Sequence, residues 1–166
     1  WWAATSNFGV LRREGGRWVP HEAVNARLGD QHVRHIVWRA SGDVWVATAR
    51  GVTALRDGTF ESLAITLPAG LTAAYALIES SATEMWVAGA GGIAVGDGSS
   101  WRLMTEADGL AGATVYSLAR AADGAVWAGG SEGIAMLPAG GAWRRFNVSN
   151  GLLSEETNSH GLLPLP

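Results

Sequence analysis

The chain has 166 residues, 48% of them hydrophobic and 16% charged, which suffices for one domain with a buried core and is not typical of disorder. Its formal net charge is −3 and its twelve basic residues are all arginine, spread along the chain, so no basic stripe indicates nucleic-acid binding. The absence of cysteine excludes disulfides, cysteine-ligated zinc and thiol chemistry, and no apolar run is long enough to cross a membrane.

The sequence opens on WWAATSNFGVLR at 1–12, and related segments recur as GDVWVATARGVTAL at 42–55, EMWVAGAGGIAV at 84–95 and AVWAGGSEGIAM at 125–136. Three columns keep one period: a tryptophan, a glycine and an outer aromatic residue. Their members are Trp2, Trp45, Trp86 and Trp127; Gly9, Gly51, Gly92 and Gly133; and Trp18, Phe60, Trp101 and Trp143. A period of about 40–45 residues is typical of propeller blades or helical arrays.

Local sequence decides between these two architectures. The last full copy contains the short runs VYSLAR, VWAGG, IAML and WRRFNV, separated by the turn segments AADGA, SEG and PAGG. Such runs have the length of strands, and no stretch combines helix caps with a 3.6-residue period. The segment LTAAYALIESSATEMW could be read as a helix, but its equivalents VRHIVWRASGDVW and VYSLARAADGAVW could not. Each repeat is therefore predicted to be a four-stranded β-propeller blade.

Two of the columns have structural roles in such a blade. The tryptophan is expected on the second strand, packed between neighbouring sheets, where a large ring buries about 150–250 Å². The glycine is expected at the start of the third strand, where a tight reversal needs a positive φ.

The predicted fold is all-β, a single propeller segment over residues 1–166. It divides into a partial blade at 1–26, blades at 27–68, 69–108 and 109–150, and the first strand of a further blade at 151–166. This amounts to four blades' worth of strands. Because four blades is the lower limit for propellers, the segment is predicted to belong to a larger ring; alternatively, the last strand closes onto the first blade.

Residues 109–137, GLAGATVYSLARAADGAVWAGGSEGIAML, resemble the two-component regulator propeller repeat. That pattern runs Gly-Leu, an apolar strand, Asp-Gly, Trp-x-Gly and Gly-Ile. It is met here by Gly109, Leu110, Val115, Leu118, Asp123, Gly124, Trp127, Gly129, Gly133 and Ile134. The other copies depart from it, with Arg27 for the leading glycine, Ala47 for the glycine after Trp45, and Thr83-Glu84 for Asp-Gly.

The resemblance implies the extracytoplasmic, periplasmic part of a bacterial sensor of the hybrid histidine kinase type. Propellers of about seven blades in that family sense a ligand, in the best-known cases an oligosaccharide. The implied partners are a small polar ligand, neighbouring propeller or sensor domains, and a second copy in a homodimer. The alternative is a propeller scaffold for protein–protein interaction without a small-molecule ligand.

No catalytic, metal or cofactor signature is present. His32 and His35 lie three apart on a predicted strand, point to opposite faces and could not easily share a metal ion. No GxSxG segment exists, and the glycine-rich run at 89–100 is followed by no helix and no lysine. The chain is therefore predicted to be non-enzymatic. Two rim carboxylates about 5–10 Å apart would revive an enzyme on a propeller frame.

The candidate ligand-binding residues come from aligning the first strand of each blade, the one nearest the central channel. One column holds Arg34, Tyr75, Tyr116 and Asn158, side chains that suit a polar ligand with apolar patches, such as a sugar. The alternative is that they are solvated in a wet channel. Rim loops add His32, Arg50 and Glu132 as further candidates, since rigid strands aim such loops at ligands.

Overall fold

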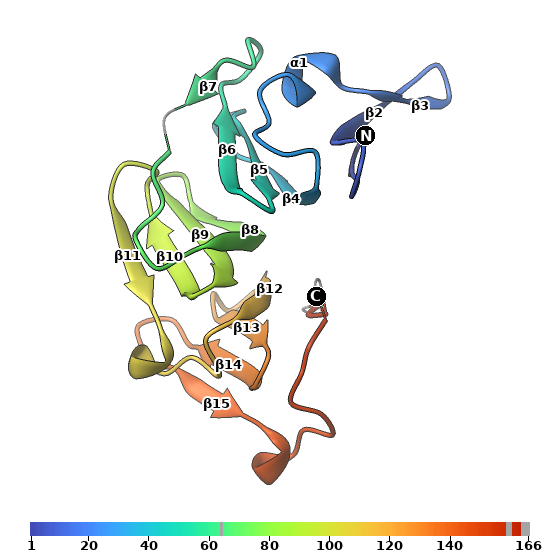
Figure 1. Ribbon diagram of the computed structural model, residues 1–166. Helices are drawn as coiled ribbons and strands as arrows, with labels where there is room; N and C mark the ends of the chain where they lie inside the picture. The colour runs from blue at the N-terminus through green and yellow to red at the C-terminus, as the bar shows by residue number, and fades with distance from the viewer. Residues whose placement is uncertain (64, 159–160, 164–166) are drawn as a thin grey trace.

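Four antiparallel sheets follow one another along an arc, each built from consecutive strands of the chain (Figure 1). The computed structural model describes residues 1–63, 65–158 and 161–163. The innermost strands β4, β8 and β12 line the concave side of the arc, and β7, β11 and β15 lie on its outer side (Figure 1). This architecture confirms the prediction of all-β propeller blades.

The first sheet has three strands, β1 (Trp2–Ala4), β2 (Val10–Glu14) and β3 (Arg17–Pro20). The second comprises β4 (Val33–Trp38), β5 (Val44–Thr48), β6 (Gly51–Leu55) and β7 (Ser62–Leu63). The third comprises β8 (Ala73–Ser81), β9 (Glu84–Ala90), β10 (Gly92–Gly96) and β11 (Trp101–Met104). The fourth comprises β12 (Val115–Arg120), β13 (Val126–Gly130), β14 (Gly133–Leu137) and β15 (Arg144–Phe146).

Helical structure among the described residues is limited to short turns. These are α1 (Glu22–Asn25) and the 3-10 turns η1 (Glu106–Asp108) and η2 (Val148–Asn150). The segment that could be read as a helix forms β8 and the start of β9, as its equivalents in the other repeats required.

The glycine column begins the third strand of each four-stranded sheet, as predicted. Gly51, Gly92 and Gly133 have φ values of 122°, 124° and 124°, which only glycine adopts without strain. A Cβ atom at Gly92 would also overlap the carbonyl oxygen of Met104 on the adjacent strand. All three glycines therefore share the backbone-angle constraint, and Gly92 and Gly133 are also restricted by the close approach of the fourth strand.

The tryptophan and outer aromatic columns contact each other across sheets, with an offset of one repeat. The ring centroids are 5.8 Å apart for Trp2 and Phe60, 6.1 Å for Trp45 and Trp101, and 6.2 Å for Trp86 and Trp143. Each pair joins the strand that carries the column tryptophan, β1, β5 or β9, to the fourth-strand region of the next sheet. This explains why both columns keep the same period.

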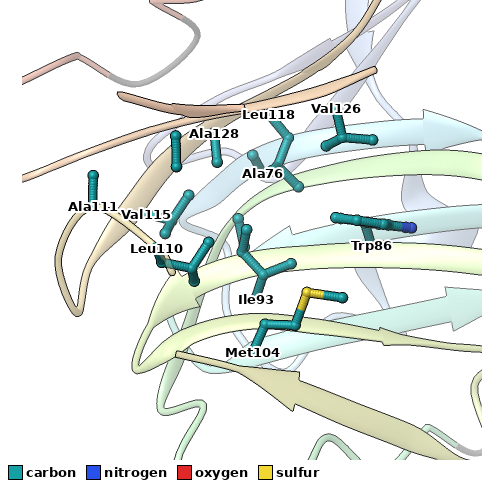
Figure 2. Close-up of a cluster of buried hydrophobic side chains, with 12 residues drawn as sticks. Ala76, Trp86, Ile93, Met104, Leu110, Ala111, Val115, Leu118, Val126 and Ala128 are labelled. Carbon is teal, nitrogen blue, oxygen red and sulfur yellow. The ribbon is translucent and has the colours of Figure 1, made fainter. Parts of the chain in front are cut away.

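The hydrophobic core consists of one cluster in each junction between neighbouring sheets. The junction of the third and fourth sheets contains the fully buried Ile93 and Leu110 beside the edge of Trp86 (Figure 2). Trp45, Leu77 and Met85 occupy the junction before it, and small alanines let the sheets approach closely. Burying an aromatic or aliphatic side chain of this size contributes about 1.5–3 kcal/mol.

Two segments are less regular than their equivalents. Phe60 lies outside β7 with a φ of 54°, and its sheet has a fourth strand of only two residues. Residues 151–158 form no strand, although the Thr157 N–H donates to the Gly130 carbonyl at 3.0 Å. That bond repeats the one from Val33 to Thr5 at 2.9 Å. The first strand of a further blade stays a prediction, and 159–160 and 164–166 lie outside the described residues.

Candidate functional site

The three innermost strands share a β-bulge at the same position. Their register against the second strand of each sheet shifts by one residue, and the residue left without a partner is Arg34, Tyr75 or Tyr116. The flanking pairs are Val33–Thr48 and His35–Ala47, Ala74–Gly89 and Ala76–Ala88, and Val115–Gly130 and Ser117–Gly129. A bulge redirects the extra side chain and is frequent beside functional sites.

The three bulged side chains form a continuous row across three sheets, named here the Arg34–Tyr75–Tyr116 row. The Arg34 guanidinium carbon lies 4.3 Å from the centroid of the Tyr75 ring. The Tyr75 and Tyr116 centroids are 5.4 Å apart at an interplanar angle of 68°. All three side chains are half-buried, so each keeps a solvent-facing part.

The row has the chemistry to bind a polar ligand with apolar faces. Tyrosine rings offer apolar surface together with a hydroxyl, and a guanidinium offers several N–H donors. Within the described part of the chain, no carboxylate lies within ion-pair distance of Arg34; its Nη1 is 3.5 Å from the Ala74 carbonyl oxygen. Its charge is therefore not neutralised by a neighbouring residue.

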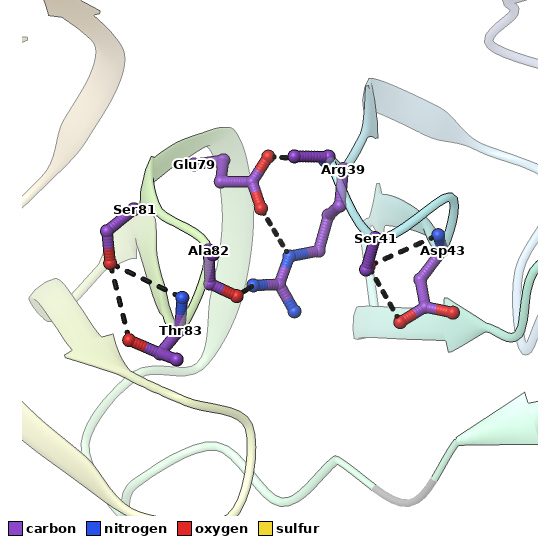
Figure 3. Close-up of polar contacts among 8 residues, drawn as sticks. Arg39, Ser41, Asp43, Glu79, Ser81, Ala82 and Thr83 are labelled. Carbon is purple, nitrogen blue, oxygen red and sulfur yellow. Dashed lines mark hydrogen bonds and ion pairs between the residues drawn. The ribbon is translucent and has the colours of Figure 1, made fainter.

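Polar contacts between the second and third sheets hold this row in place. The Leu77 N–H donates to Nδ1 of His35 at 2.8 Å, across the junction. Near the other end of the same strands, Arg39 Nε donates to Glu79 Oε1 at 3.1 Å (Figure 3). The sheets that carry Arg34 and Tyr75 are therefore joined at two further points, both beyond the row along β4 and β8.

The remaining candidate residues do not join the row. Asn158 is exposed, outside any strand, and no hydrogen bond or ring contact among the described residues links it to Tyr116. His32 and Arg50 are exposed, and their backbone N–H groups bind Asp30 Oδ1 and Thr48 Oγ1. Glu132 is exposed in the turn before β14, with its Cβ beside Gly112. These four stay predictions.

The resolved pKa shifts lie away from the row. Burial lowers the pKa of His21 from 6.5, and the nearby Arg12 guanidinium lowers it further. Hydrogen bonds from Ser100 and Ser99 in a turn lower the pKa of Asp97 to about 2. The Thr105 N–H, in the capping box of η1, lowers that of Asp108. These shifts belong to turns and to a sheet junction.

Residues 1–63, 65–158 and 161–163 contain no group of three or more histidine, aspartate or glutamate side chains that could together hold a metal ion. Over the same residues, no helix is sufficiently long and apolar to cross a bilayer.

Sequence reasoning missed the bulges and the role of His35. The His35 imidazole is half-buried and accepts a hydrogen bond across a junction. The sequence signal for this role was the alignment of the inner strands, in which the residue after Arg34 is a histidine while its equivalents, Ala76 and Ser117, are small.

Solved structures share this fold. The extracellular domain of BT3049 from B. thetaiotaomicron, described as a hybrid two-component system, aligns with a TM-score of 0.66 and 19% identity over 86% of this chain and 21% of that chain. The extracellular domain of BT4673 from the same organism, also described as a hybrid two-component system, aligns with a TM-score of 0.71 and 19% identity over 90% of this chain and 24% of that chain. A further structure of the BT4673 extracellular domain, described as a one-component system, aligns with a TM-score of 0.70 and 18% identity over 89% of this chain and 23% of that chain.

This chain therefore spans about a quarter or less of the length of these neighbours. No family model and no curated protein matches the sequence. The structural likeness shows that the chain has the fold of these extracellular domains, which are the class of protein that the repeat resemblance implied.

Proposed function

We propose that this chain is the ligand-sensing propeller segment of an extracytoplasmic sensor, and that the Arg34–Tyr75–Tyr116 row binds a small oligosaccharide. The observation that carries the proposal is the bulge repeated on three inner strands, each time at the row residue. The tyrosine rings would stack on apolar sugar faces, and the guanidinium would donate to hydroxyl or carboxylate oxygens.

The position of the row supports a sensing mechanism. Its three residues come from three different sheets, so one ligand seated on them contacts three blades at once. A ligand shifts a conformational equilibrium only by its differential affinity for the two states. A ligand that requires all three residues in line would favour one relative placement of the sheets, and neighbouring domains would respond to that placement.

The neighbours named above support the class of protein. They are extracellular domains described as belonging to two-component or one-component systems. The extracytoplasmic location, the signalling role and the absence of catalysis are proposals for this chain, because it covers a small part of those proteins.

The proposal is tested by titrating the chain with a panel of neutral and acidic oligosaccharides, followed by calorimetry and thermal unfolding. We expect one class of glycan to bind and to raise the melting temperature. Tyr75→Ala and Tyr116→Ala should each weaken that binding about tenfold, since a lost aromatic contact is worth about 0.5–1.5 kcal/mol beyond its buried area.

Trp18→Ala is the matched control, because Trp18 is a half-exposed aromatic residue on β3, outside the row. Equal effects of Trp18→Ala and Tyr116→Ala would contradict the assignment of the row. A well-folded chain that is indifferent to every glycan would favour the interaction scaffold instead.

A further inference from the structure

The three inner strands carry two kinds of side chain at the bulge. The residue is arginine in β4 and tyrosine in β8 and β12, and all three side chains are half-buried. An aromatic ring therefore fits this position, and Arg34 adds a positive charge where the other strands have none. A charge that is partly removed from water costs free energy unless a partner compensates it. The charge of Arg34 therefore calls for a partner.

The protein provides Arg34 with one aromatic ring and one distant carbonyl group. Its guanidinium carbon lies 4.3 Å from the centroid of the Tyr75 ring. Its Nη1 lies 3.5 Å from the Ala74 carbonyl oxygen, at the long limit for a hydrogen bond. Within residues 1–63, 65–158 and 161–163, Arg34 makes no ion pair and no other hydrogen bond. Since a guanidinium has several N–H donors, most of those of Arg34 remain available to a ligand.

Two other arginines show how the fold satisfies a guanidinium when its role is structural. Arg39, directly after β4, pairs with Glu79 at 3.1 Å, and Arg145 on β15 donates to the Gly109 carbonyl at 3.0 Å. Arg34 has no such partner among the described residues, and its strand lines the concave side of the arc (Figure 1). Its chemistry is therefore directed to a ligand rather than to the packing of the sheets.

We infer that the Arg34 end of the row selects acidic glycans, by binding the carboxylate of a uronic-acid residue. The inference rests on the proposed function and names the class of its ligand. A guanidinium presents a planar fork of N–H groups that matches a carboxylate in a bidentate pair. Tyr75 adjoins this fork, and its ring centroid is 5.4 Å from that of Tyr116. One ligand therefore meets a charge at one end of the row and aromatic faces at the other.

The test is a calorimetric titration of the full 166-residue chain with two acidic disaccharides, digalacturonate and cellobiouronate, and with the methyl ester of each. The ester keeps the sugar and removes the charge. We expect one acid to bind about tenfold more tightly than its ester, since charge-assisted hydrogen bonds are stronger than neutral ones. Added salt should weaken binding of the acid and leave that of the ester nearly unchanged, because screening acts on the charged ligand.

Arg34→Gln and Arg120→Gln form a matched pair of variants. Each removes one positive charge from an inner strand, and Arg120 is exposed at the far end of β12 from the row. Arg34→Gln should reduce the preference for the acid to about twofold or less, with the ester bound within about threefold of its original affinity. Arg120→Gln should leave the preference unchanged. Arg34→Lys keeps the charge without the fork and should retain only part of the preference; it decides the matter if Arg34→Gln does not fold.

The outcomes separate this inference from the proposed function. Each acid may bind no more tightly than its ester and the neutral glycans, while Tyr75→Ala still weakens glycan binding; that result overturns the inference and leaves the proposed function intact. An equal loss of preference in Arg34→Gln and Arg120→Gln also overturns it, because the overall charge would then be responsible. Failure of the chain to bind any glycan overturns both.

Discussion

Removal of Arg39 tests how the second and third sheets are held together. Its side chain is 9% exposed and pairs with Glu79, which is 17% exposed, at an Nε–Oε1 distance of 3.1 Å. Arg39 Nη2 also donates to the Ala82 carbonyl at 2.7 Å, and Glu79 Oε2 accepts the Ala40 N–H at 2.8 Å (Figure 3). The pair therefore joins the end of β4 to the β8–β9 turn.

The expected cost of Arg39→Ala follows from the groups left behind. Breaking a buried ion pair by removing one partner costs about 3–5 kcal/mol, because the other charge remains buried. Glu79 keeps the Ala40 N–H and some solvent contact, which reduces the cost, and the orphaned Ala82 carbonyl adds to it. We expect a loss of about 3 kcal/mol in the free energy of unfolding, equivalent to about 6–12 °C for a chain of this length.

The assay is urea unfolding followed by circular dichroism. The control is Arg102→Ala, which removes another arginine–carboxylate pair, at 3.3 Å, whose side chains are 71% and 32% exposed. Such an exposed pair should contribute less than about 1 kcal/mol. In Arg39→Met with Glu79→Leu, the double variant should cost less than the sum of the single ones, since no unpaired charge remains. Additive effects, or a cost for Arg39→Ala no larger than for Arg102→Ala, would refute the reasoning.

Three further predictions concern other features of the chain. Because the pKa of His21 is lowered in the folded state, its contribution to stability is present above pH 6.5 and is lost as pH falls below that value. His21→Phe should therefore reduce the slope of unfolding free energy against pH, by at most about 1.4 kcal/mol per pH unit. An unchanged slope would contradict this. Gly92→Ala should lower the free energy of unfolding by about 2 kcal/mol or more, because it adds steric overlap to a strained φ. Gly140→Ala is the control: its φ is 69° and the space around it is open, so it should cost about 1 kcal/mol. Equal costs in thermal unfolding would refute the steric overlap. Trp86→Ala should destabilise the fold by about 3–5 kcal/mol, because Trp86 contacts Trp143 across a sheet junction. Trp127→Ala should cost clearly less, because Trp127 stacks on an aromatic residue of its own sheet. The reverse order in chemical unfolding would contradict the inter-sheet role of Trp86.

The repeat allowed the blades to be predicted because its columns report constraints that every copy shares. Gly92 and its equivalents need positive φ, and Trp86 and its equivalents fill a junction, so substitution at these positions is restricted in each repeat. The inter-sheet partner of Trp86 was not predicted, because the aromatic residue that it contacts, Trp143, lies one repeat further along the chain.

The candidate site was predicted only as a column. Comparison of the copies brought Arg34, Tyr75 and Tyr116 together, but it could not reveal the bulges, since all three inner strands carry one at the same position and no copy shows an insertion. The pair of Arg39 and Glu79 was invisible for the opposite reason. Among the described residues it occurs in one junction, and the equivalents of Arg39 in the other repeats are not charged.

The three junctions along the arc each contain an apolar cluster and a tryptophan–aromatic pair, and they differ in the groups added to these. The first adds the His21 ring beside Trp2 and Phe60, the second adds the pair of Arg39 and Glu79, and the third has a buried apolar cluster around Ile93. In a linear array, each unit gains stability chiefly from its neighbours, so the ends open first. Mild acid should therefore act unevenly along the arc: amide hydrogen exchange in β1–β3, beside His21, would accelerate before that in β12–β15, so one chain would open in a pH-dependent order.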